Sequence, residues 1–90
     1  MASKLQTRTL KYLKTLKPDC WAIKVMSANE RGVPDILCCY KGRFIGIEIK
    51  EPKERVAGNQ HEQHIRIAAA GGVAIVARDL ETVKMMMEGL

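Results

Sequence analysis

Helical spacing of apolar residues marks three stretches of the chain. The first lies between Ser3 and Leu16, and its apolar face carries Leu5, Thr9, Tyr12, Leu13 and Leu16. Lysines and an arginine occupy the other faces, and Lys17-Pro18-Asp19 breaks this predicted amphipathic helix. A second helix is predicted over 60–70, and Asp79 is the predicted N-cap of a short terminal helix.

Four shorter apolar runs have the length and residue types of strands. They cover residues 21–26, 35–40, 43–50 and 73–77. In the third run, period-two alternation places one set of residues on one face, Ile45, Ile47 and Ile49, and another on the opposite face, Phe44, Gly46, Glu48 and Lys50. This run should be central in the sheet. Residues 51–59 lack any apolar period and are predicted to form a mobile surface loop. The predicted order is α-β-β-β-α-β-α, an α/β fold with a mixed sheet of about four strands flanked by helices.

The length and composition indicate one globular unit. A chain of 90 residues fits a single domain, 1–90, because separate cores usually need on the order of 100 residues each. No apolar run approaches the ~20 residues that would span a bilayer. The first residues lead directly into the helical pattern rather than into an apolar signal core. We therefore expect a soluble, cytoplasmic protein with no membrane segment.

Cysteine usage and charge narrow the function classes. The three cysteines are an odd number and none stands in a C-x-x-C pair, which argues against a disulfide framework and a thiolate zinc site. We expect reduced thiols, mostly buried. The formal charge of +5 favours a polyanionic partner. Charge alone does not decide the function, since many basic proteins bind nothing acidic.

Two carboxylates and a lysine are predicted to meet at one end of the sheet. A hairpin that turns at Lys41-Gly42 brings the start of the second strand beside the end of the third, so Asp35 should lie near Glu48 and Lys50. A carboxylate pair supplies the hard oxygen ligands that Mg²⁺ prefers, and such an ion activates water and neutralises charge on a phosphate. Lys50 could orient the water or stabilise the transition state. The competing interpretation is a Pro-Asp turn beside a solvated strand face, and the joint spacing on paired strands favours the site.

These residues resemble a known nuclease signature. Asp35, followed by Glu48-x-Lys50, is similar to the PD-(D/E)-x-K motif, and Gly32-Val33-Pro34-Asp35 together with the strand before Lys50 resembles the VRR-NUC subgroup. The resemblance implies a restriction-endonuclease-like fold, with Asp35, Glu48 and the Ile49 main-chain carbonyl binding Mg²⁺ or Mn²⁺ and Lys50 as the catalytic lysine. It implies no small-molecule cofactor.

The resemblance also implies a substrate and an assembly. Such nucleases occur in phages, in which case the location would be the host cytoplasm, and stand-alone members resemble homodimeric Holliday-junction resolvases. The family's glutamine is catalytic, and counting back from Gly71-Gly72 favours Gln60 while leaving Gln63 open. The chain has Ala2 where the family often has a glutamate, and Gln6, one turn on, offers only a neutral oxygen. We expect a homodimer that cuts branched DNA, paired through the apolar faces of the last strand and the terminal helix, around Val83, Met86 and Met87.

Other signals are weaker. His61 and His64 are three residues apart, not the four of a zincin helix, so no metal is assigned to them. Five cations are candidate DNA contacts: Lys24, Arg31, Lys53, Arg55 and Arg66. Trp21 and the Met85-Met86-Met87 run are interpreted as packing residues. The alternatives to a structure-specific nuclease are a non-catalytic nucleic-acid-binding module, a simple duplex nickase and a homodimeric interaction domain without DNA function.

Overall fold

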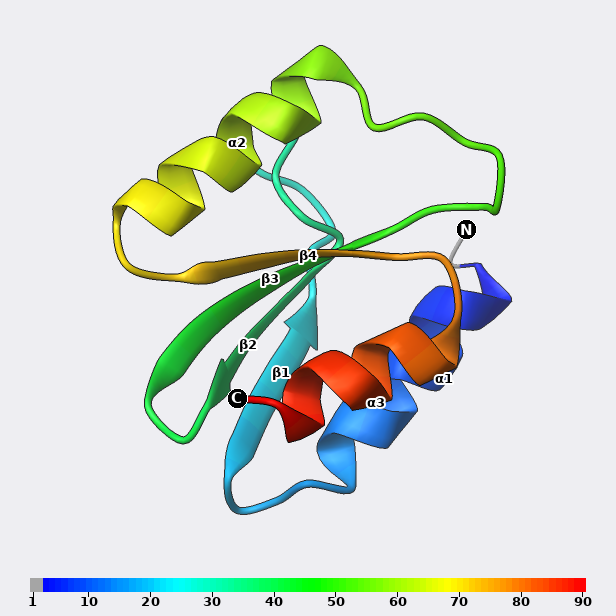
Figure 1. The fold of residues 1–90 in the computed structure, drawn as a ribbon, viewed down its shortest axis with the longest axis vertical. Coiled ribbons are helices and arrows are strands. Elements are labelled where there is room, and N and C mark those ends of the chain that lie inside the picture. The colour runs from blue at the N-terminus through cyan, green and yellow to red at the C-terminus, as the bar shows by residue number, and fades with distance from the viewer. Residues whose placement is uncertain (1–2) are drawn as a thin grey trace.

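A computed structural model describes residues 3–90 and has the predicted order of elements (Figure 1). The elements are α1 (Lys4–Lys14), β1 (Cys20–Lys24), β2 (Ile36–Tyr40), β3 (Arg43–Ile49), α2 (Gly58–Ala69), β4 (Val73–Ala77) and α3 (Leu80–Glu88). The last strand has its predicted bounds, and the other strands and the first two helices differ from their predictions by one or two residues at their ends. Asp79 caps α3 as predicted, because its side chain accepts a hydrogen bond from the Thr82 N–H. Ala2 lies outside the described residues.

The sheet is mixed and has the order β1-β2-β3-β4. The first three strands pair antiparallel, and β3 pairs parallel with β4, so β3 is central as predicted. The β2–β3 hairpin turns at Lys41 and Gly42, which have φ values of 52° and 80°. Positive φ at both turn residues belongs to the tight hairpin turns whose twist matches that of the strands. This turn fixes the register that brings the start of β2 beside the end of β3.

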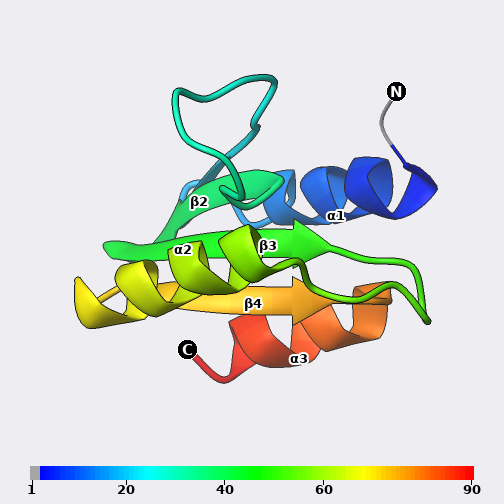
Figure 2. The ribbon, with the colours of Figure 1, turned by 90° about the horizontal axis from the view of Figure 1, so that it is seen from above.

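Helices cover the two faces of the sheet unequally (Figures 1 and 2). α1 and α3 pack against each other on one face, and the core between them and the sheet contains Leu13, Ile36, Cys38, Ile45, Ile47, Ile75, Ala77, Val83 and Met87. α2 lies on the other face, over β4, and its Ile67 approaches Gly46 of β3. No helix of residues 3–90 is long and apolar enough to cross a membrane.

Part of the α2 face has no cover. Trp21 is 61% exposed, Phe44 45% and Ile23 40%. The prediction that Trp21 is a packing residue is therefore wrong. β1 is an edge strand, and in residues 3–90 α2 packs mainly over β4, with Ile67 reaching β3, which leaves the outward side chains of β1 largely uncovered.

The terminal helix also differs from its prediction. Val83 and Met87, four residues apart on one helix face, are buried in the core of this chain, whereas Met85 is 70% and Met86 42% exposed. Of the methionine run, only Met87 packs fully. Val83 and Met87 cannot form a surface for a second copy, because α1 and the sheet already cover them. Cys20 and Cys38 are buried free thiols, while Cys39 is exposed.

Candidate active site

Asp35 is held at the end of the sheet by its neighbours on both sides. Its main-chain oxygen accepts from Val25 N at 2.8 Å, and its Oδ2 accepts from Ile49 N at 2.8 Å. Asp35 therefore joins the ends of β1 and β3. The Ile36–Ile47 pair is the last pair of the β2–β3 ladder, so Asp35 stands one step beyond it, opposite Glu48. The sequence prediction of this approach is confirmed.

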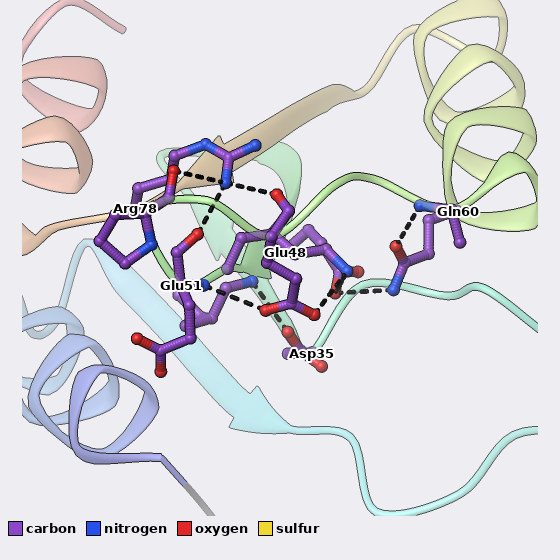
Figure 3. Close-up of polar contacts among 10 residues, drawn as sticks. Asp35, Glu48, Glu51, Gln60 and Arg78 are labelled. Carbon is purple, nitrogen blue, oxygen red and sulfur yellow. Dashed lines mark hydrogen bonds and ion pairs between the residues drawn. The ribbon is translucent and has the colours of Figure 1, made fainter.

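Glu48 is a buried carboxylate with one oxygen unsatisfied. The residue is 3% exposed, and its Oε2 accepts from Gln60 Nε2 at 3.1 Å. Its Oε1 is buried and has no hydrogen-bond partner among the described residues. Burial, and after it the hydrogen bond and negative charge of Asp35, raise the pKa of Glu48 to about 8, against the lowering effect of Lys50. Two carboxylates thus face each other in a low-dielectric site (Figure 3).

Lys50 follows β3 and is 5% exposed. Its Nζ lies 3.9 Å from Glu48 Oε2 and 3.3 Å from Glu54 Oε2. Its main-chain N–H donates to the carbonyl of Ala77 at 3.0 Å, which fixes the residue against β4. A lysine so deeply buried needs carboxylate partners, and it has one on each side. The ammonium is therefore held within the carboxylate cluster rather than in solvent.

Arg78 organises the loop that carries Glu54. Its Nη1 donates to the main-chain oxygens of Glu51 at 2.7 Å and Glu54 at 2.6 Å (Figure 3). Glu54 Oε1 in turn accepts from Glu51 N at 3.1 Å, and this hydrogen bond, with the one from Lys50, lowers the pKa of Glu54. The loop after β3 lacks regular structure as predicted, but it is anchored. Sequence reasoning missed both residues, although the four-residue spacing of Lys50 and Glu54 was a visible signal.

The structure separates the two candidate glutamines. Gln60, in the first turn of α2, donates to Glu48 and accepts from Ala57 N at 2.8 Å, so its amide orientation is fixed from both ends. Gln63 instead donates to Glu30 Oε1 at 3.0 Å and to the Arg31 carbonyl at 3.1 Å, away from the carboxylates. Gln60 is thus the residue placed beside Glu48 and Asp35.

These groups line one pocket with a volume of about 270 Å³. Its lining residues are Ser3, Gln6, Asp35, Glu48, Ile49, Lys50, Glu51, Glu54 and Gln60. All five residues predicted for catalysis or metal binding are among them. The N-terminal turn of α1 adds Ser3, whose Oγ accepts from Gln6 N as the helix N-cap. Ser3 was not singled out from the sequence, although the family resemblance had drawn attention to its neighbours Ala2 and Gln6.

The arrangement fits a hard divalent cation. The buried Glu48 Oε1 lacks a partner, and an adjacent Asp35 carboxylate repels its charge, so a cation between them would satisfy both. Residues 3–90 contain no group of three or more His, Cys, Asp or Glu side chains arranged around a metal position. A set of two carboxylates and the Ile49 carbonyl suits Mg²⁺ or Mn²⁺, because Mg²⁺ usually retains several waters.

The candidate DNA contacts lie outside this pocket. Lys24 ends β1 and is half-buried, while Arg31, Lys53 and Arg55 are exposed on loops. Arg66 is engaged with acidic neighbours, at 3.4 Å from Glu30 and 3.3 Å from Glu62, so it is less available to a phosphate. The His64 Nε2 atom is buried without a partner in the described part of the chain, and burial lowers the pKa of His64.

Comparison with known proteins identifies the fold. No protein-family model matches the chain, and no curated protein matches it either. A solved structure described as "VRR_NUC domain" superimposes with a TM-score of 0.80 at 20% sequence identity, covering 94% of this chain and 91% of that one. The similarity extends over nearly the whole of both chains. The chain therefore has the fold of a VRR_NUC domain, as the sequence resemblance implied.

Proposed function

We propose that this protein is a divalent-metal-dependent endonuclease that hydrolyses phosphodiester bonds in DNA. The observation that carries the proposal is the convergence of Asp35, Glu48, Lys50 and Gln60 in one pocket at the end of the central hairpin. The fold that the chain shares with the solved VRR_NUC domain also supports it. The net charge of +5 is in keeping with a polyanionic substrate.

Each side chain has a defined part in this reaction. The Ile49 N–H holds Asp35, and the Gln60 amide holds Glu48, so that both carboxylates are oriented before substrate arrives. A bound Mg²⁺ or Mn²⁺ supplies Lewis acidity and positive charge at the scissile phosphate. Lys50 places its ammonium beside Glu48, where it can stabilise negative charge that builds on the phosphate or orient the attacking water.

The test is cleavage of a DNA panel. Labelled duplex, flap, single-stranded and four-way junction DNAs are incubated with the protein in Mg²⁺, Mn²⁺ or EDTA. We expect cleavage with either cation and none in EDTA, and Asp35→Ala and Glu48→Ala should each abolish both cleavage and divalent-ion binding. Glu62→Gln, on the exposed side of α2, is the matched control and should cut normally. DNA binding without cleavage in either cation would instead indicate a non-catalytic binding module.

We further propose that two copies act together through the open side of the sheet. The cross-strand register places Trp21, Cys39 and Phe44 in one row on this face, with Ile23 in the next row. Three of these side chains are large, apolar and at least 40% exposed. This face replaces the terminal helix as the candidate contact between copies.

A homodimer also suits branched DNA. Specific protein–DNA interfaces usually bury ~1,000 Å² or more of protein surface, and a lone module of this size offers little. A two-fold axis doubles the contact and relates two active sites as strands of opposite polarity require. We therefore propose paired cuts in four-way junctions. Single nicks in linear duplex, made as readily as in a junction, would contradict this and indicate a simple nickase.

A further inference from the structure

A groove between α1 and β1 adjoins the active-site pocket. It has a volume of about 340 Å³, and its lining residues are Gln6, Thr7, Leu10, Lys11, Lys14 and Lys24. Gln6 lines both this groove and the active-site pocket, so the two cavities meet at that side chain. A chain-like substrate bound at Glu48 can therefore continue into the groove.

The groove is cationic and its lysines are unengaged. No acidic residue lines it, and none of Lys11, Lys14 and Lys24 lies within 4.0 Å of a carboxylate oxygen in residues 3–90. Two other cations near the site are occupied, since Lys50 is bound by carboxylates and Arg78 by loop carbonyls. The three groove lysines are thus available to an incoming anion.

A second cavity also borders the pocket, but its charges are mixed. Three cations, Lys4, Arg8 and Arg78, line it together with three carboxylates, Glu51, Asp79 and Glu81. A polyanion leaving the pocket on that side would pass these negative charges, whereas the α1–β1 groove presents only positive ones. Electrostatics therefore favours the α1–β1 groove as the path.

The dimensions of the groove match a short stretch of nucleic acid backbone. From Gln6 to Lys14 the helix rises by about 12 Å, at 1.5 Å per residue. Successive phosphates of one duplex strand are spaced by about 3.4 Å along the axis, so this length spans roughly three nucleotides. Lys11 and Lys14 lie one turn apart on the helix, and Lys24 faces them from β1.

We infer that this groove binds the sugar–phosphate backbone of the DNA strand on one side of the scissile phosphate, with Lys11, Lys14 and Lys24 contacting successive phosphates. The inference rests on the proposed nuclease function and specifies where its substrate lies. Leu10 and the aliphatic stems of the lysines form an apolar floor on which sugars can pack. The sequence pattern had suggested Lys24 alone of these three.

The experiment compares salt-dependent DNA binding of two triple variants. Lys11→Gln/Lys14→Gln/Lys24→Gln removes the groove charges. Lys17→Gln/Lys41→Gln/Arg43→Gln removes three charges at the opposite end of the sheet, beside the hairpin turn. Binding to a fluorescein-labelled four-way junction, and to the duplex and single strand from which it is made, is measured in EDTA between about 50 and 200 mM salt. Circular dichroism and thermal melting confirm that both variants are folded.

Each phosphate contact contributes about 0.9 to the slope of log K against log salt for duplex DNA and about 0.7 for a single strand. Loss of three contacts should lower the slope by about 2 to 3 and weaken binding by about 100- to 500-fold at 0.1 M salt. The control variant should retain the wild-type slope. The inference would be overturned if wild type and groove variant had equal slopes, or if both variants lost DNA affinity equally. It would also be overturned if the wild type had no affinity for DNA. Cleavage by wild type in Mg²⁺, measured in parallel, decides the proposed function separately.

Discussion

Replacing Glu48 with glutamine should make the metal-free protein more stable above neutral pH. The carboxyl is 3% exposed, faces the Asp35 carboxylate and has one oxygen without a partner. Ionisation in this place is unfavourable, because burial and a like charge both oppose it. Glutamine keeps the shape, its carbonyl can still accept from Gln60, and its NH₂ group can donate to Asp35. The variant therefore removes the charge, and with it the ion pair to Lys50, while retaining the hydrogen bond from Gln60.

The size and sign of the effect follow from linkage. The pKa of Glu48 is about 8 in the fold against 4.5 for an unperturbed carboxyl. At 1.36 kcal/mol per pKa unit, ionising Glu48 lowers the free energy of unfolding by about 5 kcal/mol. A raised carboxyl pKa contributes stability that is present below about pH 4.5 and is lost as the pH rises to about 8. His64 contributes with the opposite sign, because its pKa is lowered, but it is present in both proteins and cancels in the difference.

The assay is urea unfolding in EDTA from about pH 5 to pH 9. The free energies of unfolding of wild type and Glu48→Gln should be similar at the acid end, and the variant should be the more stable by several kcal/mol at the alkaline end. Mg²⁺ should stabilise wild type in the alkaline range and leave the variant unchanged, since the variant lacks one of the two carboxylates. Glu62→Gln, at an exposed position, should shift stability by no more than about 0.5 kcal/mol at any pH. A difference between wild type and Glu48→Gln that does not grow with pH would refute the reasoning.

Three further substitutions test other parts of the site and of the assembly. Lys50→Ala should retain divalent-ion binding, because an ammonium is not a cation ligand, but lower kcat by about 100-fold or more; native turnover would remove Lys50 from the mechanism. Arg78→Ala breaks charged hydrogen bonds that contribute about 1.5 kcal/mol or more each, so amide exchange over residues 51–57 should accelerate by about tenfold or more and kcat should fall as Glu54 leaves Lys50. Unchanged exchange would show that other contacts hold the loop. In sedimentation at micromolar concentration, Trp21→Asp should convert a dimer to a monomer, whereas Met85→Asp, at an even more exposed apolar position on α3, should not; the opposite result would return the contact to the terminal helix.

The hairpin and its carboxylates could be predicted because their cause is local. A two-residue turn between alternating strands fixes the register, and the register alone places Asp35 opposite Glu48. The hydrophobic periods likewise predicted the four strands and the first two helices to within two residues at their ends. Such features depend on neighbours a few residues away, and the residue pattern contains that information.

Features that depend on how elements are placed in space could not be predicted in the same way. Arg78 anchors carbonyls 24 and 27 residues earlier in the chain, and no residue pattern marks a main-chain acceptor. Trp21 has the spacing of a core residue, and its exposure results from the position of α2 over the far edge of the sheet. Val83 and Met87 are the opposite case. From the sequence, their helix face could pack either within this chain or against a second copy, and in the fold α1 covers it.

The choice between Gln60 and Gln63 shows where counting along a helix stops being sufficient. Three residues apart, the two side chains lie on nearly the same helix face and differ by roughly 4.5 Å along the axis, so both remained candidates. Their separation is decided by Gly32, which has a φ of 82° and packs backbone to backbone against the first turn of α2. A Cβ on Gly32 would collide with the Asn59 carbonyl oxygen and lie 2.7 Å from Gln60 N. The loop that precedes Asp35 therefore also fixes the position of α2 along its axis. In this position Gln60 lies opposite Glu48, and Gln63 lies beside Glu30.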